Sequence, residues 1–425
     1  MSSFHIVEHS IPCQHIREYP RALSGSQEDV LHLAVKQYIP KDNPNPRPGD
    51  VTIIGAHANG FPKELYEPLW DDILARSKRD GFRIRSIWIA DVAQQGQSSV
   101  LNEELLGNDP NWNDHPRDLL HLINWKRDQM PRPLIGIGHS MGGNHLVNLA
   151  YIHPRLLTTL VLIDPVIQVY SSVAPEAGPS PARLSSFRRD VWPSREDAAQ
   201  SFKTSKFYQA WDPRVLDCWI KYGLRDMPTL LHPAEKNKPG PPPVTLTTPL
   251  HQEVFTFLRP NYEGNGYQGK AVNRKTHPDL NPSLPTIYPF YRAEGPQAFF
   301  RLEELRPSVL YIFGGRSDVG TPEACKAKMD RTGVGVGGSG GAAAGRVRSV
   351  LFEDIGHLIA MEAVERTADH ASEWIGSEMT RWKEDEAEHE RYWNSKSLIE
   401  KQTIDDQWKK MIGGPMTRKP KQPKL

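Results

Sequence analysis

The sequence has little cysteine and almost no excess of charge of either sign. Its 425 residues contain three cysteines, Cys13, Cys218 and Cys325, which are far apart and odd in number. A disulfide framework is therefore not expected, and a reducing compartment is favoured. The 52 lysines and arginines nearly balance the 51 aspartates and glutamates. This balance gives no electrostatic footprint for nucleic acid or for an anionic membrane.

Long hydrophobic runs are also missing. No apolar stretch approaches the length of a membrane span, and the N-terminus MSSFHIVEHS lacks the basic and then apolar layout of a secretory signal. With 38% hydrophobic and 24% charged residues, the composition is that of ordinary globular proteins, and the chain is long enough for one large domain with an insertion. We therefore expect a soluble, intracellular protein.

The clearest motif in the chain is a G-x-S-x-G pattern centred on Ser140. The apolar run 134–137 predicts a buried strand, and residues 144–150 predict the start of a helix, so the serine and its two glycines lie in the turn between them. In such a nucleophile elbow the serine adopts a strained backbone conformation that exposes its hydroxyl. The pattern predicts that Ser140 is a nucleophile and that the backbone N–H of Met141 contributes to an oxyanion hole.

A second oxyanion donor is expected from the loop that follows the predicted strand 51–55. This loop, residues 56–62, has the sequence AHANGFP. Its small residues let the backbone approach a substrate closely. We expect the N–H of Asn59 to be the donor, with Phe61 as the second choice. The alternative is a plain strand-to-helix turn with a proline near the helix start.

Candidates for the base and the acid occur in the second half of the chain. Ser140, Asp318 and His357 follow one another in this order, each at the carboxyl end of a predicted strand, which is the order typical of a serine nucleophile on a parallel sheet. We expect His357 to accept the proton of Ser140 and Asp318 to orient the imidazole. Asp164, at the end of another predicted strand, is the alternative acid.

The remaining histidines show no metal-ligand pattern, so a metal site is not expected. This applies to the histidines nearest the serine motif, His139, His145 and His153.

The strand and helix patterns predict an α/β fold with a mostly parallel sheet and helices on both of its faces. The alternation stops after the strand that ends at Asp164, where prolines, tryptophans and helical periodicity predict a largely helical cap. The aromatic side chains of the cap suit an apolar acyl or polyketide-like substrate, or they form the core of the cap itself. The predicted divisions are a core from 1–165 and 306–378, a cap from 166–305, and a charged helical tail from 379–425.

The motifs AHANGFP, GHSMGG, GGRSD and EDIGHLIAMEA together resemble the α/β-hydrolase superfamily over residues 51–165 and 306–374. Within it, HANGF followed by a long cap and a peroxisome-type C-terminus looks like the fungal group that contains the AK-toxin biosynthesis hydrolases and the yeast peroxisomal lipase. The resemblance implies a cofactor-free serine hydrolase that cleaves an ester or thioester of a fatty-acid-like or polyketide-like acid through an acyl-enzyme. Such an enzyme would act in fungal toxin or other secondary-metabolite biosynthesis, or in peroxisomal lipid metabolism.

Two other functions remain compatible with the sequence. One is a non-catalytic protein of the same fold that binds a lipid or a partner through the cap, and the other is an acyltransferase. A serine at position 140 argues against the epoxide-hydrolase and haloalkane-dehalogenase branches, in which the nucleophile is an aspartate.

The chain closes with Pro423-Lys424-Leu425 after a basic stretch, one residue away from the S-K-L peroxisomal address. We expect a peroxisomal import receptor to bind this terminus, with the cytoplasm as the alternative location.

Overall fold

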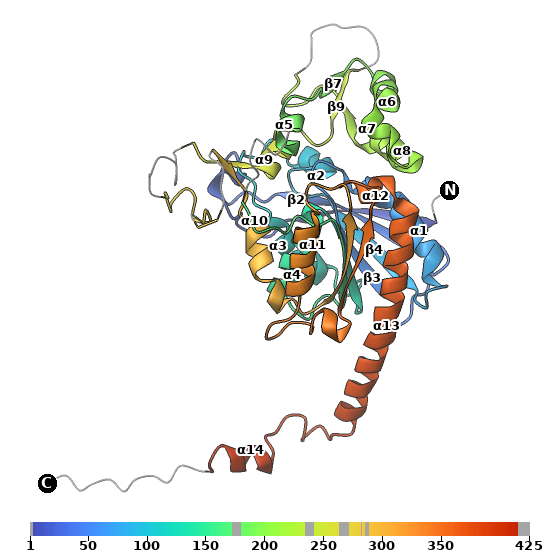
Figure 1. Cartoon of the computed structure of the whole chain (residues 1–425), viewed down its shortest axis with the longest axis vertical. Coiled ribbons are helices and arrows are strands. Elements are labelled where there is room, and N and C mark those ends of the chain that lie inside the picture. Colours follow the sequence, from blue (N-terminus) through green and yellow to red (C-terminus); the bar gives the residue numbers. More distant parts are fainter. Residues whose placement is uncertain are drawn as a thin grey trace, which may run out of the picture. The chain divides into compact units, whose positions relative to one another are not determined.

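The computed structural model describes residues 3–171, 180–233, 242–262, 272–281, 283–284 and 289–414 (Figure 1). The predicted peroxisomal address lies outside these residues. The chain splits into two compact units, Met1–Glu378 and Met379–Leu425. The second unit contains the end of helix α13 (Val364–Asn394) and helix α14 (Asp406–Met411). The sheet and every residue predicted for catalysis lie in the first unit.

An eight-stranded sheet forms the centre of the first unit. Its strand order is β1-β2-β4-β3-β5-β6-β12-β13. The strands are β1 (Phe4–Pro12), β2 (His32–Pro40), β3 (Val51–Ala56), β4 (Ile84–Ala90), β5 (Leu134–His139), β6 (Thr159–Ile163), β12 (Ser308–Gly314) and β13 (Val347–Phe352). Strand β2 pairs antiparallel with β1 and β4, and all the other pairs are parallel. The predicted mostly parallel sheet is confirmed.

Helices cover both faces of this sheet, as Figure 1 shows. They are α1 (Glu67–Ser77), α3 (Asp114–Trp125), α4 (Met141–Ile152), α11 (Pro322–Arg331) and the first part of α13. The unit also contains the short helices α2 (Gly96–Leu101) and α12 (Ile359–Glu362). Every residue of β3, β5, β6 and β12 is buried. Strands covered on both faces need apolar residues at successive positions, which is why these segments have continuous hydrophobic runs instead of alternation.

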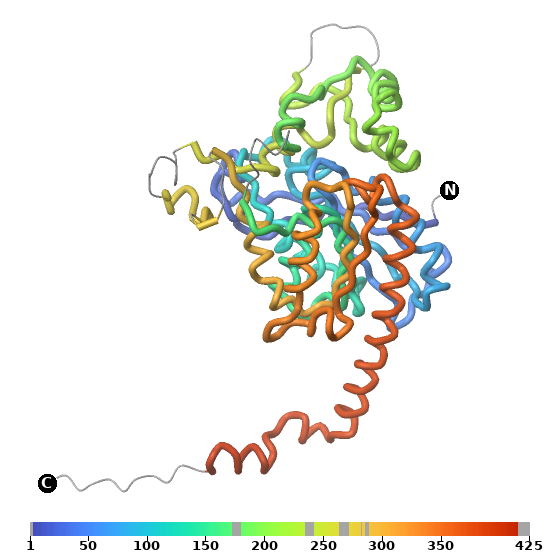
Figure 2. The backbone as a smooth tube through the Cα atoms, viewed as in Figure 1, coloured from blue at the N-terminus to red at the C-terminus, as the bar shows by residue number. Residues whose placement is uncertain are grey.

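The chain leaves the sheet after β6, passes through a long insertion and returns at β12 (Figure 2). The insertion contains helices α5 (Pro181–Ser186), α6 (Arg195–Thr204), α7 (Lys206–Gln209), α8 (Pro213–Tyr222), α9 (Leu250–Phe257) and α10 (Glu294–Phe300). Its strands are β7 (Val191–Trp192), β8 (Leu224–Asp226) and β9 (Val244–Leu246), which form one small sheet, and the pair β10 (Arg259–Pro260) and β11 (Phe290–Tyr291). Strands of two or three residues are too short to show a periodicity in the sequence.

The helices of the insertion pack around aromatic rings. Trp211 and Trp219 lie 6.2 Å apart, and Phe202 and Tyr208 lie 4.8 Å apart between ring centroids. Trp211, Trp219 and Phe202 are nearly inaccessible to solvent. These side chains form the core of the cap.

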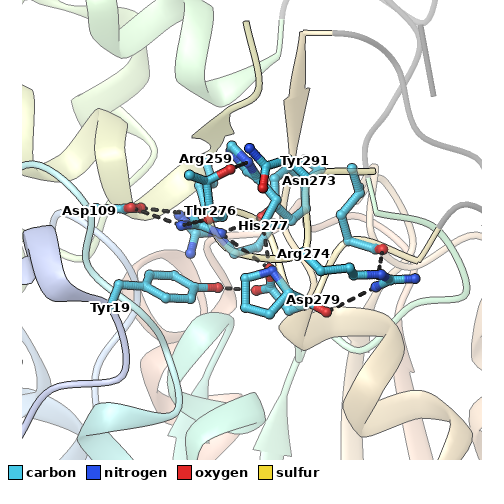
Figure 3. Close-up of polar contacts among 12 residues, drawn as sticks. Tyr19, Asp109, Arg259, Asn273, Arg274, Thr276, His277, Asp279 and Tyr291 are labelled. Carbon is cyan, nitrogen blue, oxygen red and sulfur yellow. Dashed lines mark hydrogen bonds and ion pairs between the residues drawn. The ribbon is translucent and has the colours of Figure 1, made fainter. Parts of the chain in front are cut away.

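A buried arginine ties the second half of the insertion to the core (Figure 3). Arg259 donates to both carboxylate oxygens of Asp109, at 2.8 and 2.9 Å, and its guanidinium lies 3.7 Å from the ring centre of Tyr19. Asp279 accepts hydrogen bonds from Tyr19 and from Tyr291. Removing one partner of such a buried ion pair destabilises a protein by about 3–5 kcal/mol, because the other charge stays buried without a partner. The network thus links the insertion to Tyr19 and Asp109.

Four histidines are fully buried: His57, His115, His139 and His145. Burial is the main cause that lowers the pKa of each, and the pKa of His139 falls to about 3. The rings of His115 and His145 lie 5.0 Å apart, and neither has a hydrogen-bond partner within the described part of the chain. All four imidazoles are therefore neutral in the folded protein at pH 7. Among the described residues, no cluster of His, Cys, Asp and Glu is arranged to hold a metal ion, and no helix could cross a membrane.

The buried histidines predict how stability depends on pH. Below about pH 6.5 the histidines of the unfolded chain take up protons, whereas the buried rings of the folded protein stay neutral. The free energy of unfolding therefore falls as the pH drops, by up to about 1.4 kcal/mol per pH unit for each buried histidine. His115→Phe should remove one such group. We expect urea unfolding of this variant between pH 7 and 5.5 to show a slope of stability against pH that is shallower than that of the wild type, by about 0.8 kcal/mol per unit on average. Equal slopes would mean that His115 is protonated in the fold.

Candidate active site

Ser140 occupies the turn between β5 and α4 with φ 57° and ψ −118°. A positive φ is strained for any residue other than glycine. The N–H of Ser140 donates to the carbonyl of Ile163 at 2.9 Å, and its carbonyl accepts from the N–H of Val166 at 3.1 Å, so β6 and its following loop hold the turn in place. A Cβ atom at Gly142 would lie 2.1 Å from the carbonyl oxygen of Ala56. Only glycine fits where α4 begins beside β3.

Three side chains meet at the carboxyl edge of the sheet. The Oγ of Ser140 lies 2.7 Å from Nε2 of His357, and Nδ1 of His357 lies 2.6 Å from Oδ2 of Asp164. Ser140 and Asp164 are buried, whereas 29% of the His357 side chain is exposed. A ring nitrogen that faces a carboxylate carries a proton, which leaves Nε2 free to accept the serine proton. The arrangement has the geometry of a Ser–His–Asp triad.

The acid in this arrangement is Asp164, and the expectation that Asp318 would pair with His357 is wrong. Asp318 is exposed in the loop after β12, and no hydrogen bond joins it to His357 in the described structure. Strands β6 and β12 are neighbours in the sheet, so the loops that follow their carboxyl ends both lie close to His357. Chain order alone does not say which of the two loops turns its carboxylate towards the ring.

The end of β12 and the loop after it contribute hydrogen bonds to the carboxylate of Asp164. Ser317, the residue before Asp318, is buried and donates its hydroxyl to Oδ2 of Asp164, while the N–H of Gly314 lies 3.4 Å from Oδ1. Burial alone would raise the pKa of Asp164, but the hydrogen bonds from His357, Ser317 and Gly314 outweigh it and hold this pKa below its usual value. Ser317 is not recognisable as part of the site from the sequence, because a serine in a loop gives no signal of its own.

Three backbone amides of the loop between β3 and α1 already have acceptors. The N–H of Ala58 donates to Oη of Tyr66 at 2.8 Å, that of Gly60 to Oε1 of Gln95 at 2.8 Å, and that of Phe61 to the carbonyl of Ala58 at 3.3 Å. The N–H of Asn59 has no acceptor within the described residues. Of the two donors considered for this loop, Asn59 is therefore the one that remains available.

The insertion holds this loop from the other side. The side chain of Asn59 donates to the carbonyl of Glu253 in α9 at 3.1 Å and accepts from Gln95 at 2.6 Å. The ring of Phe61 packs edge-on against Trp211 and Trp219, at 5.6 and 6.2 Å between ring centroids. The backbone of the loop therefore depends on the cap being docked.

The fold and this geometry define a hydrolase built on a parallel sheet, and comparison with known proteins agrees. The profile of the alpha/beta hydrolase family matches residues 53–370. The chain belongs to this family, and the resemblance to the superfamily is confirmed.

Two relatives and one solved structure refine the comparison. The type I acyl-CoA thioesterase mpaH of Penicillium roqueforti (strain FM164) is 43% identical over 417 residues, which cover 94% of each chain. The abhydrolase domain-containing protein AKT2 of Alternaria alternata is 27% identical over 251 residues, covering 58% of this chain and 84% of its own. The crystal structure of the peroxisomal alpha-beta-hydrolase Lpx1 of Saccharomyces cerevisiae covers 94% of this chain and 100% of its own, with a TM-score of 0.65 and 17% identity. The predicted likeness to this fungal group is confirmed.

The position of the acid leads to a direct test. Asp164→Asn should lower kcat for thioester or ester hydrolysis by about 10,000-fold, because an uncharged amide no longer holds the imidazole in the correct tautomer. Asp318→Asn removes the same charge from the exposed loop and should keep kcat within about twofold. Product release by both purified variants would be followed at pH 7. A similar loss in both variants would contradict the assignment of Asp164.

Proposed function

We propose that the protein hydrolyses an acyl-CoA thioester through an acyl-enzyme on Ser140. The observation that carries the proposal is the pair of hydrogen bonds, 2.7 and 2.6 Å long, that joins Ser140 to His357 and His357 to Asp164. The 43% identity to an acyl-CoA thioesterase over 94% of the chain supports the thioester as the substrate class.

The reaction begins with proton transfer from Ser140 to His357. As Oγ attacks the thioester carbonyl carbon, Nε2 of His357 takes its proton, and the negative charge of Asp164 stabilises the imidazolium that forms. The carbonyl oxygen becomes an oxyanion, for which the N–H groups of Met141 and Asn59 are the proposed donors. Collapse of this intermediate breaks the carbon–sulfur bond, and the leaving thiolate takes the proton from His357.

Water completes the cycle. His357 removes a proton from a water molecule, the hydroxide attacks the acyl-enzyme carbonyl, and the second intermediate collapses to the free acid as Oγ regains the proton. All the groups required come from the protein, the substrate and water.

The acyl group is proposed to be fatty-acid-like or polyketide-like, of the kind made in fungal secondary metabolism. The support is the 43% identity to a fungal acyl-CoA thioesterase, together with the aromatic residues of the cap, of which Trp211 packs against Phe61 in the loop of Asn59. An apolar and aromatic surrounding favours an apolar acyl chain.

The proposal is tested with a series of acyl-CoA esters and free-thiol detection. The wild type should release CoA and the free acid, whereas Ser140→Ala and His357→Ala should lower kcat by about a million-fold, because removing the nucleophile or the base abolishes the covalent route. A fluorophosphonate probe should label Ser140 in the wild type only.

Other outcomes identify the alternatives. Transfer of the acyl group to an added alcohol or thiol in preference to water would indicate an acyltransferase. Bound lipid without turnover, together with an unlabelled Ser140, would indicate a non-catalytic binding protein. Either result would overturn the proposed hydrolysis.

We also propose a peroxisomal location, with Pro423-Lys424-Leu425 bound by the import receptor. Its support is the sequence alone, a basic segment that closes in a near-match to a peroxisomal address. Residues 415–425 fused behind a fluorescent protein should direct it to peroxisomes in a fungal cell, and the fusion that lacks the last three residues should stay diffuse. A diffuse signal from the complete fusion would refute the proposal and favour the cytoplasm.

A further inference from the structure

Two buried side chains, Tyr66 and His139, lie between the loop of the oxyanion donors and the loop of the catalytic base. The N–H of Ala58 is 2.8 Å from Oη of Tyr66, and the same oxygen is 3.0 Å from Nδ1 of His139. Nε2 of His139 is in turn 2.9 Å from the carbonyl oxygen of His357. Three hydrogen bonds thus connect the residue before Asn59 to the backbone of the base.

Each hydrogen bond in this chain has only one possible direction. The carbonyl of His357 can only accept, so Nε2 of His139 carries the proton. A neutral imidazole then accepts at Nδ1, so the Tyr66 hydroxyl donates there and accepts from the N–H of Ala58. Burial, with the neighbouring His357, lowers the pKa of His139 to about 3, and burial raises the pKa of Tyr66, so both groups keep these protonation states.

This chain of hydrogen bonds also reaches the nucleophile, because His139 is the last residue of β5 and precedes Ser140 in the sequence. Tyr66 closes the short 3-10 helix Lys63–Tyr66 that follows the oxyanion loop. The nucleophile, the loop of Ala58 and Asn59, and the base lie on three separate segments of the sequence. The same chain of hydrogen bonds connects all three segments.

We infer that Tyr66 and His139 are positioning residues that set the distance between the base and the oxyanion donors. The inference rests on the proposed function, because it concerns the same reaction. Packing alone does not explain the two polar groups: Tyr66 and His139 are 2% and 0% exposed, and an apolar ring would fill the same space without the cost of burying a hydroxyl and an imidazole.

Tyr66→Phe tests the inference by removing one oxygen. The change leaves the N–H of Ala58 and Nδ1 of His139 without partners, so both loops relax. We expect kcat per titrated site to fall about 10- to 100-fold, with KM changed by less than about threefold, as expected for lost positioning during the chemical step. The acid limb of the pH profile of kcat/KM should also shift, because it reports the base of the free enzyme.

Tyr311→Phe is the matched control. The hydroxyl of Tyr311 in β12 is also buried and lies 2.8 Å from the hydroxyl of Thr332, away from the triad. This variant also loses a buried tyrosine hydrogen bond, so its melting temperature should fall like that of Tyr66→Phe. Its kcat per titrated site and its pH profile should stay those of the wild type.

A pair of substitutions at His139 separates the two halves of the chain. In His139→Gln the side-chain amide reaches the position of Nε2 and can still donate to the carbonyl of His357. In His139→Asn the amide reaches only the position of Nδ1, where it can still pair with Tyr66. Each variant keeps one hydrogen bond of residue 139 and loses the other. We therefore expect both to show the lower kcat and the shifted acid limb of Tyr66→Phe, and this pair decides the question if Tyr66→Phe does not fold.

The measurements use fluorophosphonate titration of Ser140 to count competent sites and a model thioester to obtain kcat. Failure of the wild type to label or to turn over would remove the proposed function itself. Wild-type activity together with folded Tyr66→Phe and His139→Asn variants of unchanged kcat and pH profile would overturn only the positioning role.

Discussion

The hydrogen bond between Asp164 and His357 is the interaction on which the rest of the site depends. The two residues are 193 positions apart in the sequence. They meet because β6 and β12 are parallel neighbours, with β13 beside β12, so that the loops at their carboxyl ends gather at one edge of the sheet. With Nδ1 fixed by the carboxylate, Nε2 is directed at Ser140 and can act as the base.

Backbone strain at two of the three triad positions shows how strongly the sheet holds this site. Ser140 and Asp164 have φ values of 57° and 41°, and conformations of this kind cost about 1–3 kcal/mol each. Fully buried strands flank both turns and keep them in place. Polar groups fixed in advance by the fold need no reorganisation when charge develops, which is the usual source of catalytic stabilisation in such sites.

The cap also contacts the loop that contains Asn59 and Phe61. Glu253 in α9 accepts a hydrogen bond from Asn59, while Trp211 and Trp219 hold the ring of Phe61. The loop expected to supply an oxyanion donor is therefore shaped by the insertion on one side and by Tyr66 on the other. The aromatic residues that the sequence offers both as substrate lining and as cap core serve as that core, and through Phe61 they also brace the active-site loop.

The parallel sheet and the turn at Ser140 could be predicted from the sequence, because continuous apolar strands and a strand–turn–helix with two glycines are encoded by near neighbours. The family could be recognised from the resemblance of four short motifs. The remaining features depend on the tertiary structure. The choice between Asp164 and Asp318 as the partner of His357 depends on which of several adjacent loops turns its side chains inward. The same holds for the support that the site receives from Ser317, Tyr66 and His139. That choice is made by packing between strands and by the hydrogen bonds that buried polar groups must find, and neither is visible in the spacing of residues along the chain.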